Sequence, residues 1–173
     1  MAENSCSSPP FLLTPIGPSM LRTTILRHEP DPGGPQPHFD WLLEAASTAS
    51  PEDRVVPTYR CRRRPDRLAI GESIRLQKID AHRGWWLARS ILEEVTLGPP
   101  MGTARVIQSG RIDSEPPLLL TSMESTVCWS QSRRVMTYRL EQIRPGEVLA
   151  TRIAPFSMDH ESSPSPVTGV SLL

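Results

Sequence analysis

The sequence lacks an excess of either charge, because its 19 Lys and Arg residues are balanced by 19 Asp and Glu residues. Strong non-specific attraction to nucleic acid through bulk charge is therefore not expected, although a local basic face remains open. Lysine is almost absent, so arginine supplies nearly all of the positive charge. Arginine suits planar, bidentate contacts with phosphate or carboxylate. The competing explanation is a general codon bias toward arginine.

Paired cysteines and long apolar runs are also missing. Cys6, Cys61 and Cys128 lie far apart and form neither a CxxC pair nor a zinc-ligand spacing. This sparse, odd set is typical of a reducing compartment, so we expect a cytoplasmic protein. No apolar run approaches the length of a transmembrane span. The segment "FLLTPIG" is too short and too rich in proline for a secretory signal.

Proline is abundant, with 19 residues, about twice the average share of roughly 5%. The prolines gather near both ends of the chain and in the segment 99–117. We therefore expect a flexible N-terminal arm over 1–19, one domain over 20–156 and a flexible tail over 157–173.

Short segments rich in β-branched and apolar residues recur at intervals of about ten residues. We expect strands at 20–28, 38–45, 54–63, 73–80, 102–112, 125–131, 134–143 and 147–155. The last two flank "RPG", a good turn, and should form a hairpin. The segment 84–95 fits either a helix or a strand. Since strands and helices do not alternate, the sequence predicts a mainly β protein, a small antiparallel β-barrel with at most one or two short helices.

The stretch "RHEPDPGGPQPHFDWLLE", residues 27–44, holds two of the four histidines. On a strand, His38 and Asp40 would share one face, while the intervening and following apolar residues would face a core. His28 ends the preceding predicted strand, and the loop with two glycines can bring it alongside. Two histidines and one carboxylate on one face predict a divalent-metal site with positions open for water or substrate. A proline-rich turn with a chance His-x-Asp is the alternative.

The segments "LRHEPDPGGPQPHFDWLLE", "DAHRGWW", "GTARVIQSG" and "MTYRLEQI" resemble, in this order, the 3′-phosphoesterase domain of bacterial DNA ligase D and its free-standing relatives. The resemblance covers roughly residues 21–154. It implies a small β-barrel with a manganese-dependent site that removes 3′-terminal phosphates and ribonucleotides from DNA.

By this resemblance, particular residues acquire expected roles. His28, His38 and Asp40 match the metal ligands of the family. His82 matches a histidine that contacts the scissile phosphate, and Trp86 falls where the family usually has a phosphate-contacting tyrosine.

The sequence also departs from the family pattern. Leu42 stands where the family usually has an arginine on the site face, and leucine cannot hold phosphate. The loop between the two histidines carries Glu29 and Asp31, which would repel a DNA backbone. Trp86 can only donate a hydrogen bond. The metal ligands therefore match the family better than the phosphate-binding groups.

A basic run, "RCRRRPDR", offers a different source of phosphate contacts. On a strand, Arg60, Arg62 and Arg64 would line one face and could contact a nucleic-acid backbone. A solvated strand edge that blocks aggregation is the alternative. The adjacent Trp85 and Trp86 could stack on a base, or be divided between core and surface.

The resemblance implies hydrolysis of a phosphoester at a DNA 3′ end, with Mn²⁺, or alternatively Zn²⁺ or another divalent metal, as the cofactor. His82 would donate a hydrogen bond to a phosphate oxygen or protonate the leaving oxygen. The expected partners are DNA 3′ ends or primer-templates, with a DNA ligase or other repair proteins as further candidates, and a monomer is expected. Two alternatives remain open: an Fe(II) oxygenase using a His-x-Asp…His pattern, and a non-enzymatic nucleic-acid- or protein-binding module of the same fold.

Overall fold

The computed structural model describes residues 21–45, 50–114 and 122–154. The predicted arm over 1–19 and the predicted tail over 157–173 lie outside these residues. No helix in the described part of the chain is both long enough and apolar enough to cross a membrane.

The described residues form nine strands and two short 3₁₀ helices, and no longer helix is present among them. The strands are β1 (Leu21–Glu29), β2 (His38–Leu43), β3 (Arg54–Cys61), β4 (Ser73–Arg83), β5 (Glu94–Gly98), β6 (Gly102–Ile112), β7 (Ser122–Trp129), β8 (Val135–Arg144) and β9 (Glu147–Ile153). The 3₁₀ helices are η1 (Pro65–Arg67) and η2 (Gly84–Ala88).

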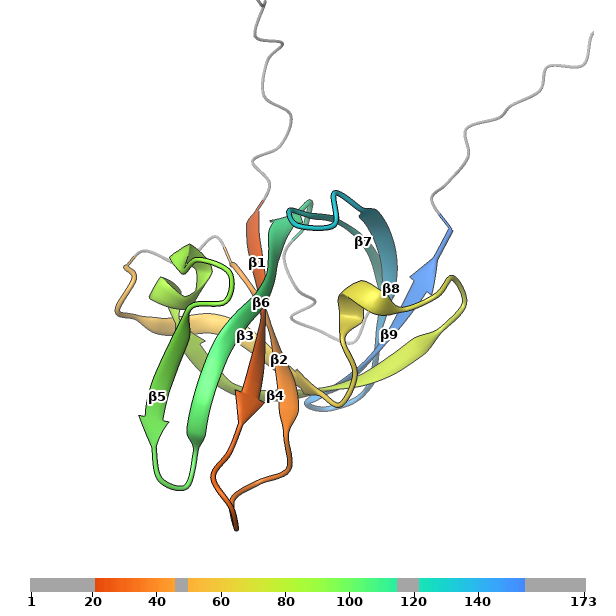
Figure 1. Cartoon of the computed structure of the whole chain (residues 1–173). Helices are drawn as coiled ribbons and strands as arrows, with labels where there is room; N and C mark the ends of the chain where they lie inside the picture. Colours follow the sequence, from red (N-terminus) through yellow and green to blue (C-terminus); the bar gives the residue numbers. More distant parts are fainter. Residues whose placement is uncertain (1–20, 46–49, 115–121, 155–173) are drawn as a thin grey trace, which may run out of the picture.

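All strand pairs are antiparallel, and eight of the nine strands close into a barrel (Figure 1). The strand order is β1-β2-β3-β4-β9-β8-β7-β6, and pairing of β6 with β1 closes the circle. β5 pairs with β6 outside this circle and extends the sheet on one side. The prediction of a small antiparallel β-barrel is therefore confirmed, and so is the predicted β8–β9 hairpin.

Two apolar clusters hold the barrel together, one on each face of the β1–β2–β3 wall. The larger cluster fills the barrel and includes Trp41, Trp129 and Tyr138. The smaller cluster lies on the outer face, where η2 packs against β1. Residues of β2 alternate between the two clusters, as a strand with both faces covered must do. Trp41 and Leu43 face the barrel interior, whereas Leu42 joins the outer cluster.

Three local predictions need correction or completion. The expected strand over 54–63 ends at Cys61, because the chain turns there to enter η1 at Pro65. Pro57 does lie at an irregularity, since the pairing of β3 with β4 shifts register on both sides of Val56. The segment 84–95 forms η2 and the start of β5, so it is neither one helix nor one strand.

Candidate metal centre

Pairing of β1 with β2 brings the first two histidines together. His28 lies directly opposite His38 in the antiparallel register. Their rings stack with centroids 4.8 Å apart and an interplanar angle of 11°. Asp40 follows His38 by two residues, so its side chain emerges on the same face of the wall. The predicted i, i+2 arrangement on β2 is confirmed.

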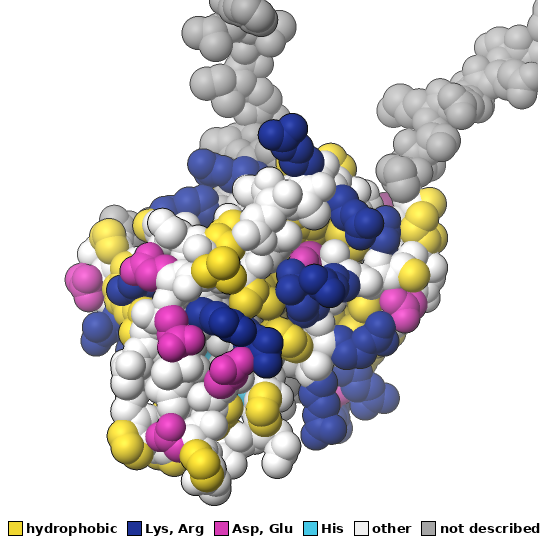
Figure 2. Space-filling view, in the orientation of Figure 1, with side chains coloured by type: hydrophobic (Ala, Val, Ile, Leu, Met, Phe, Trp, Pro, Cys, Tyr) yellow, Lys and Arg dark blue, Asp and Glu magenta, His cyan; other side chains and the backbone are white. Residues whose placement is uncertain are grey.

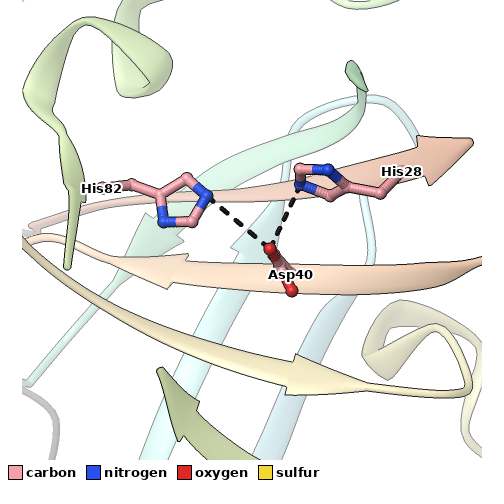
Figure 3. A group of neighbouring side chains, drawn as sticks. All are labelled: His28, Asp40 and His82. Carbon is pink, nitrogen blue, oxygen red and sulfur yellow. Dashed lines mark ion pairs between the residues drawn. The ribbon is translucent and has the colours of Figure 1, made fainter. Parts of the chain in front are cut away.

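The third histidine arrives from a strand further around the barrel. His82 lies near the end of β4, where it pairs with Val56 of β3. His28 Nε2 lies 3.1 Å and His82 Nε2 lies 3.6 Å from the same Asp40 oxygen, Oδ2 (Figure 3). One ligand atom from each of these three residues lies within 4.8 Å of the others. His38 Nε2 lies 3.8 Å from the other oxygen, Oδ1. Asp40 is thus the centre of a cluster with three histidines, which we call the His/Asp cluster.

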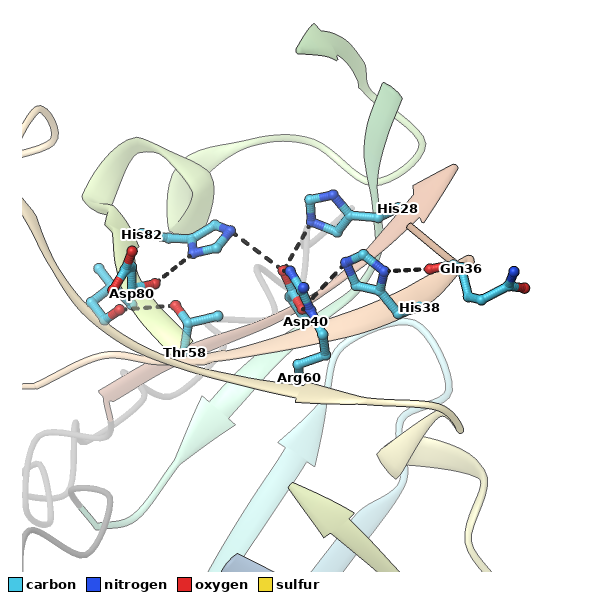
Figure 4. Close-up of polar contacts among 9 residues, drawn as sticks. His28, Gln36, His38, Asp40, Thr58, Arg60, Asp80 and His82 are labelled. Atoms are coloured by element: carbon cyan, nitrogen blue, oxygen red, sulfur yellow. Dashed lines mark hydrogen bonds and ion pairs between the residues drawn. The ribbon is translucent and has the colours of Figure 1, made fainter. Parts of the chain in front are cut away.

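Backbone carbonyls fix the orientation of two of these rings. His38 Nδ1 donates to the carbonyl of Gln36 at 2.7 Å, and His82 Nδ1 donates to the carbonyl of Asp80 at 3.3 Å (Figure 4). Burial lowers the pKa of His38 and of His82, which favours neutral rings. A neutral ring has one N–H, so in both residues the Nε2 lone pair faces Asp40. This is the arrangement in which proteins present imidazole to a metal ion.

Two buried nitrogens of the cluster, Nδ1 of His28 and Nε2 of His38, have no hydrogen-bond partner among the described residues. His28 Nε2 lies 3.1 Å from Asp40 Oδ2 and contacts it. Buried polar atoms are nearly always paired. Moreover, an imidazole lone pair that faces a carboxylate is repelled unless a cation or a donor lies between them. The donor set therefore fits a divalent cation.

Arg60 closes the other side of Asp40. It lies opposite Asp40 on β3, and its Nε and Nη2 donate to the two carboxylate oxygens at 3.1 and 3.3 Å. Asp40 is fully buried. Burial alone would raise the pKa of Asp40, but the contacts with His28 and Arg60 outweigh it and hold that pKa well below its usual range. Asp40 is therefore ionised at neutral pH.

A cavity of about 470 Å³ opens beside the cluster. Its lining includes His28, His82, Arg60 and Trp86, together with Arg54, Arg83 and Trp85. Trp86 is buried in its wall and stacks on Trp85 with centroids 4.4 Å apart. No sequence pattern indicated that Arg54 and Arg83 would line this cavity. They reach the cavity because β3 and β4 run antiparallel with Arg54 opposite Arg83.

Leu42 is fully buried in the outer apolar cluster. The position at which relatives of the resembled family carry an arginine is therefore part of an apolar wall in this protein. Arg60 brings a guanidinium to the cluster from the neighbouring strand instead.

The predicted arginine face is only partly present. Arg60 lies on β3, whereas Arg62 and Arg64 follow the end of the strand and are not part of it. Arg64 forms a fork onto Asp66 of η1, at 3.0 and 2.7 Å, so it has a structural role. Arg62 is exposed on the bend.

Glu29 and Glu44 of the 27–44 stretch are also held by arginines. Glu29 lies 2.8 Å from Arg27 and 3.6 Å from Arg105, so its charge is offset locally. Glu44, the last residue of the motif, accepts three hydrogen bonds from Arg22 and fastens the end of β2 to the start of β1.

The chain matches no protein-family model, and neither the curated proteins nor the solved structures contain a match to it. A functional assignment must therefore come from the residues of the His/Asp cluster and its surroundings.

Proposed function

We propose that this protein is a divalent-metal-dependent phosphoesterase that processes the 3′ ends of DNA, removing a terminal phosphate or ribonucleotide. One observation carries the proposal: three imidazole nitrogens converge on a buried, ionised carboxylate, and one of them, His38 Nε2, has no hydrogen-bond partner among the described residues. The same residues carry the resemblance to the ligase D phosphoesterase domain.

Asp40 with His28 and His38 would hold the metal, which leaves His82 for the phosphate. Imidazole and carboxylate together suit Mn²⁺ and Zn²⁺, and the proposed cofactor is Mn²⁺. A metal bound here would polarise a phosphoryl oxygen and lower the pKa of a water molecule. The backbone carbonyls of Gln36 and Asp80 keep the rings of His38 and His82 in the required orientation.

The cavity supplies groups that suit a phosphate. Arg60 has a side chain that is 34% exposed, so its guanidinium contacts Asp40 and also reaches the cavity. Arg54 and Arg83 line the same space. His82 is 19% exposed, and its Nε2 faces the cluster at the cavity wall. In its protonated form it would donate to a phosphate oxygen, which is the role that the resemblance implies.

The metal-dependent reaction is tested directly with a primer-template that ends in a 3′-phosphate or a 3′-ribonucleotide. With Mn²⁺ present, the wild type should trim the end and His38→Ala should not. Titration with Mn²⁺, followed calorimetrically, checks the metal separately. A wild-type protein that binds no divalent metal would contradict the proposal.

A binding module without catalysis is the second candidate. It is favoured by Leu42, which closes one side of the cluster with an apolar side chain. In that case the protein would shift 3′-tailed duplex DNA in a salt-dependent manner, and Mn²⁺ would produce no trimming.

A further inference from the structure

The strand register extends the face of the His/Asp cluster across the barrel wall. Asp40 of β2 pairs with Arg60 of β3, and Arg60 pairs with Gln77 of β4. Gln77 in turn pairs with Glu147 of β9. Residues directly opposite on neighbouring strands lie on the same face. Since neighbouring strands lie ~4.8 Å apart, this row extends about 14 Å from the cluster.

A basic groove of about 850 Å³ lies over this row and reaches the cluster at His38. We call it the arginine groove, because its lining includes Arg60, Arg62, Arg63, Arg75 and Arg144. The carboxylates paired with these side chains are Asp40, Glu72 and Glu147. Five guanidinium groups therefore face three carboxylates, which leaves an excess of two positive charges.

This excess is local, since the whole chain has a formal net charge of zero. Figure 2 shows one face of the molecule, on which Lys and Arg side chains are densest on the right, while Asp and Glu side chains on the left are interspersed with Lys and Arg.

Two arginines of the groove are available to an incoming anion. Arg62 is exposed and has no ion-pair partner among the described residues. The side chain of Arg75 is 75% exposed, and it shares the buried Glu147 with Arg144. Arg62 can therefore fork onto a phosphate without breaking an ion pair, and Arg75 has only to release a carboxylate that Arg144 also holds.

We propose that the arginine groove binds the sugar–phosphate backbone of the strand whose 3′ end enters the His/Asp cluster. The location of the 3′ end rests on the proposed function, whereas strand binding in the groove can be tested without catalysis. The row of about 14 Å is long enough for more than one phosphate of a strand. A chain of regularly spaced phosphates fits such a row better than a single anion does.

The test measures binding of a fluorescent, 3′-phosphorylated 12-nucleotide single strand by anisotropy, with metal chelated by EDTA. The groove variant is Arg62→Ala combined with Arg75→Ala. The control combines Arg133→Ala with Arg134→Ala, which removes the same charge from exposed positions in the β7–β8 turn. This turn lies at the opposite end of β8 from Arg144. Arg62→Ala alone is the second variant, because Arg62 contacts no described partner.

We expect the groove variant to raise Kd at least tenfold and the control to leave it unchanged. The slope of log Kd against log salt should fall by about 1.4 in the groove variant and by about 0.7 in Arg62→Ala, since each phosphate contact on a single strand contributes ~0.7. Equal losses in the groove variant and the control would overturn the proposal, as would unchanged binding in the groove variant. Displacement of the strand by polyglutamate at equal charge concentration would assign the groove to an acidic peptide. Intact strand binding without any Mn²⁺-dependent trimming would reject the phosphoesterase function but not the groove.

Discussion

Asp40 and Arg60 lie directly opposite each other on β2 and β3, and the guanidinium of Arg60 spans both oxygens of the buried carboxylate. The remaining sides of that carboxylate face histidines. Arg60 therefore compensates the charge of Asp40 when no cation is bound, and it also lines both the cavity and the arginine groove. Arg60 therefore connects the His/Asp cluster, the cavity and the arginine groove.

Substitution of Arg60 tests this connection. Arg60→Ala should lower the free energy of unfolding of the metal-free protein by about 1–3 kcal/mol, because two hydrogen bonds to a buried charge are lost. Addition of Mn²⁺ should recover most of the loss, since the cation then compensates Asp40. Urea unfolding with EDTA and with Mn²⁺ measures both values. Arg60→Lys is the control, which keeps the charge but not the fork. A loss that Mn²⁺ does not change would contradict this role for Arg60.

Metal binding should be visible as stabilisation. A ligand that binds only the folded state at 100 times its Kd adds about 2.7 kcal/mol. For a barrel of this size that corresponds to a rise in Tm on the order of 10 °C. The wild type should show this rise with Mn²⁺ in a thermal melt, and EDTA should reverse it. Asp40→Asn should show no rise, because it loses the central carboxylate ligand. An equal rise in Asp40→Asn would place the metal elsewhere.

Much of the site could be predicted because it depends on local periodicity. The alternation around His38 and Asp40 is a property of six consecutive residues, and β2 forms as the pattern requires. The position of His28 could also be predicted, because a short loop connects β1 to β2 and places His28 opposite His38.

The remaining features depend on contacts between distant strands, which no local pattern contains. Arg60 reaches Asp40 only because β3 pairs with β2 in this register. The strand expected over 54–63 ends before Arg62 because the chain turns toward η1, which begins at Pro65. Arg64 then donates hydrogen bonds to Asp66. The carbonyls of Gln36 and Asp80, which orient two histidines, belong to the backbone and leave no trace in side-chain identity.

Glu44 should make stability depend on pH. Burial raises its pKa, but the hydrogen bonds from Arg22 outweigh burial and lower it. Because the folded pKa lies below the unfolded value of about 4.3, the stabilisation is complete above that value and is lost as pH falls through the folded pKa. In urea unfolding, the free energy of unfolding of the wild type should exceed that of Glu44→Gln by about 1–2 kcal/mol at pH 7. This difference should shrink below pH ~4. Glu94→Gln, which removes a carboxylate from an exposed position without a described partner, is the matched control. If the difference in free energy of unfolding between wild type and Glu44→Gln did not change with pH, the contact with Arg22 would not depend on the charge of Glu44.

The substitution Leu42→Arg tests whether this protein tolerates an arginine at the position where the resembled family usually has one. Leu42 is fully buried and shares the outer cluster with Val56 and Trp86. Leu42→Arg would bury a charge without a partner, so the free energy of unfolding should fall by more than about 3 kcal/mol. Leu42→Met, which conserves volume, should cost less than about 1.5 kcal/mol. Denaturant unfolding of both variants provides the comparison. A Leu42→Arg protein as stable as the wild type, with tighter binding of a 3′-phosphorylated oligonucleotide, would show that the wall opens toward the site and that Arg60 does not replace the missing arginine.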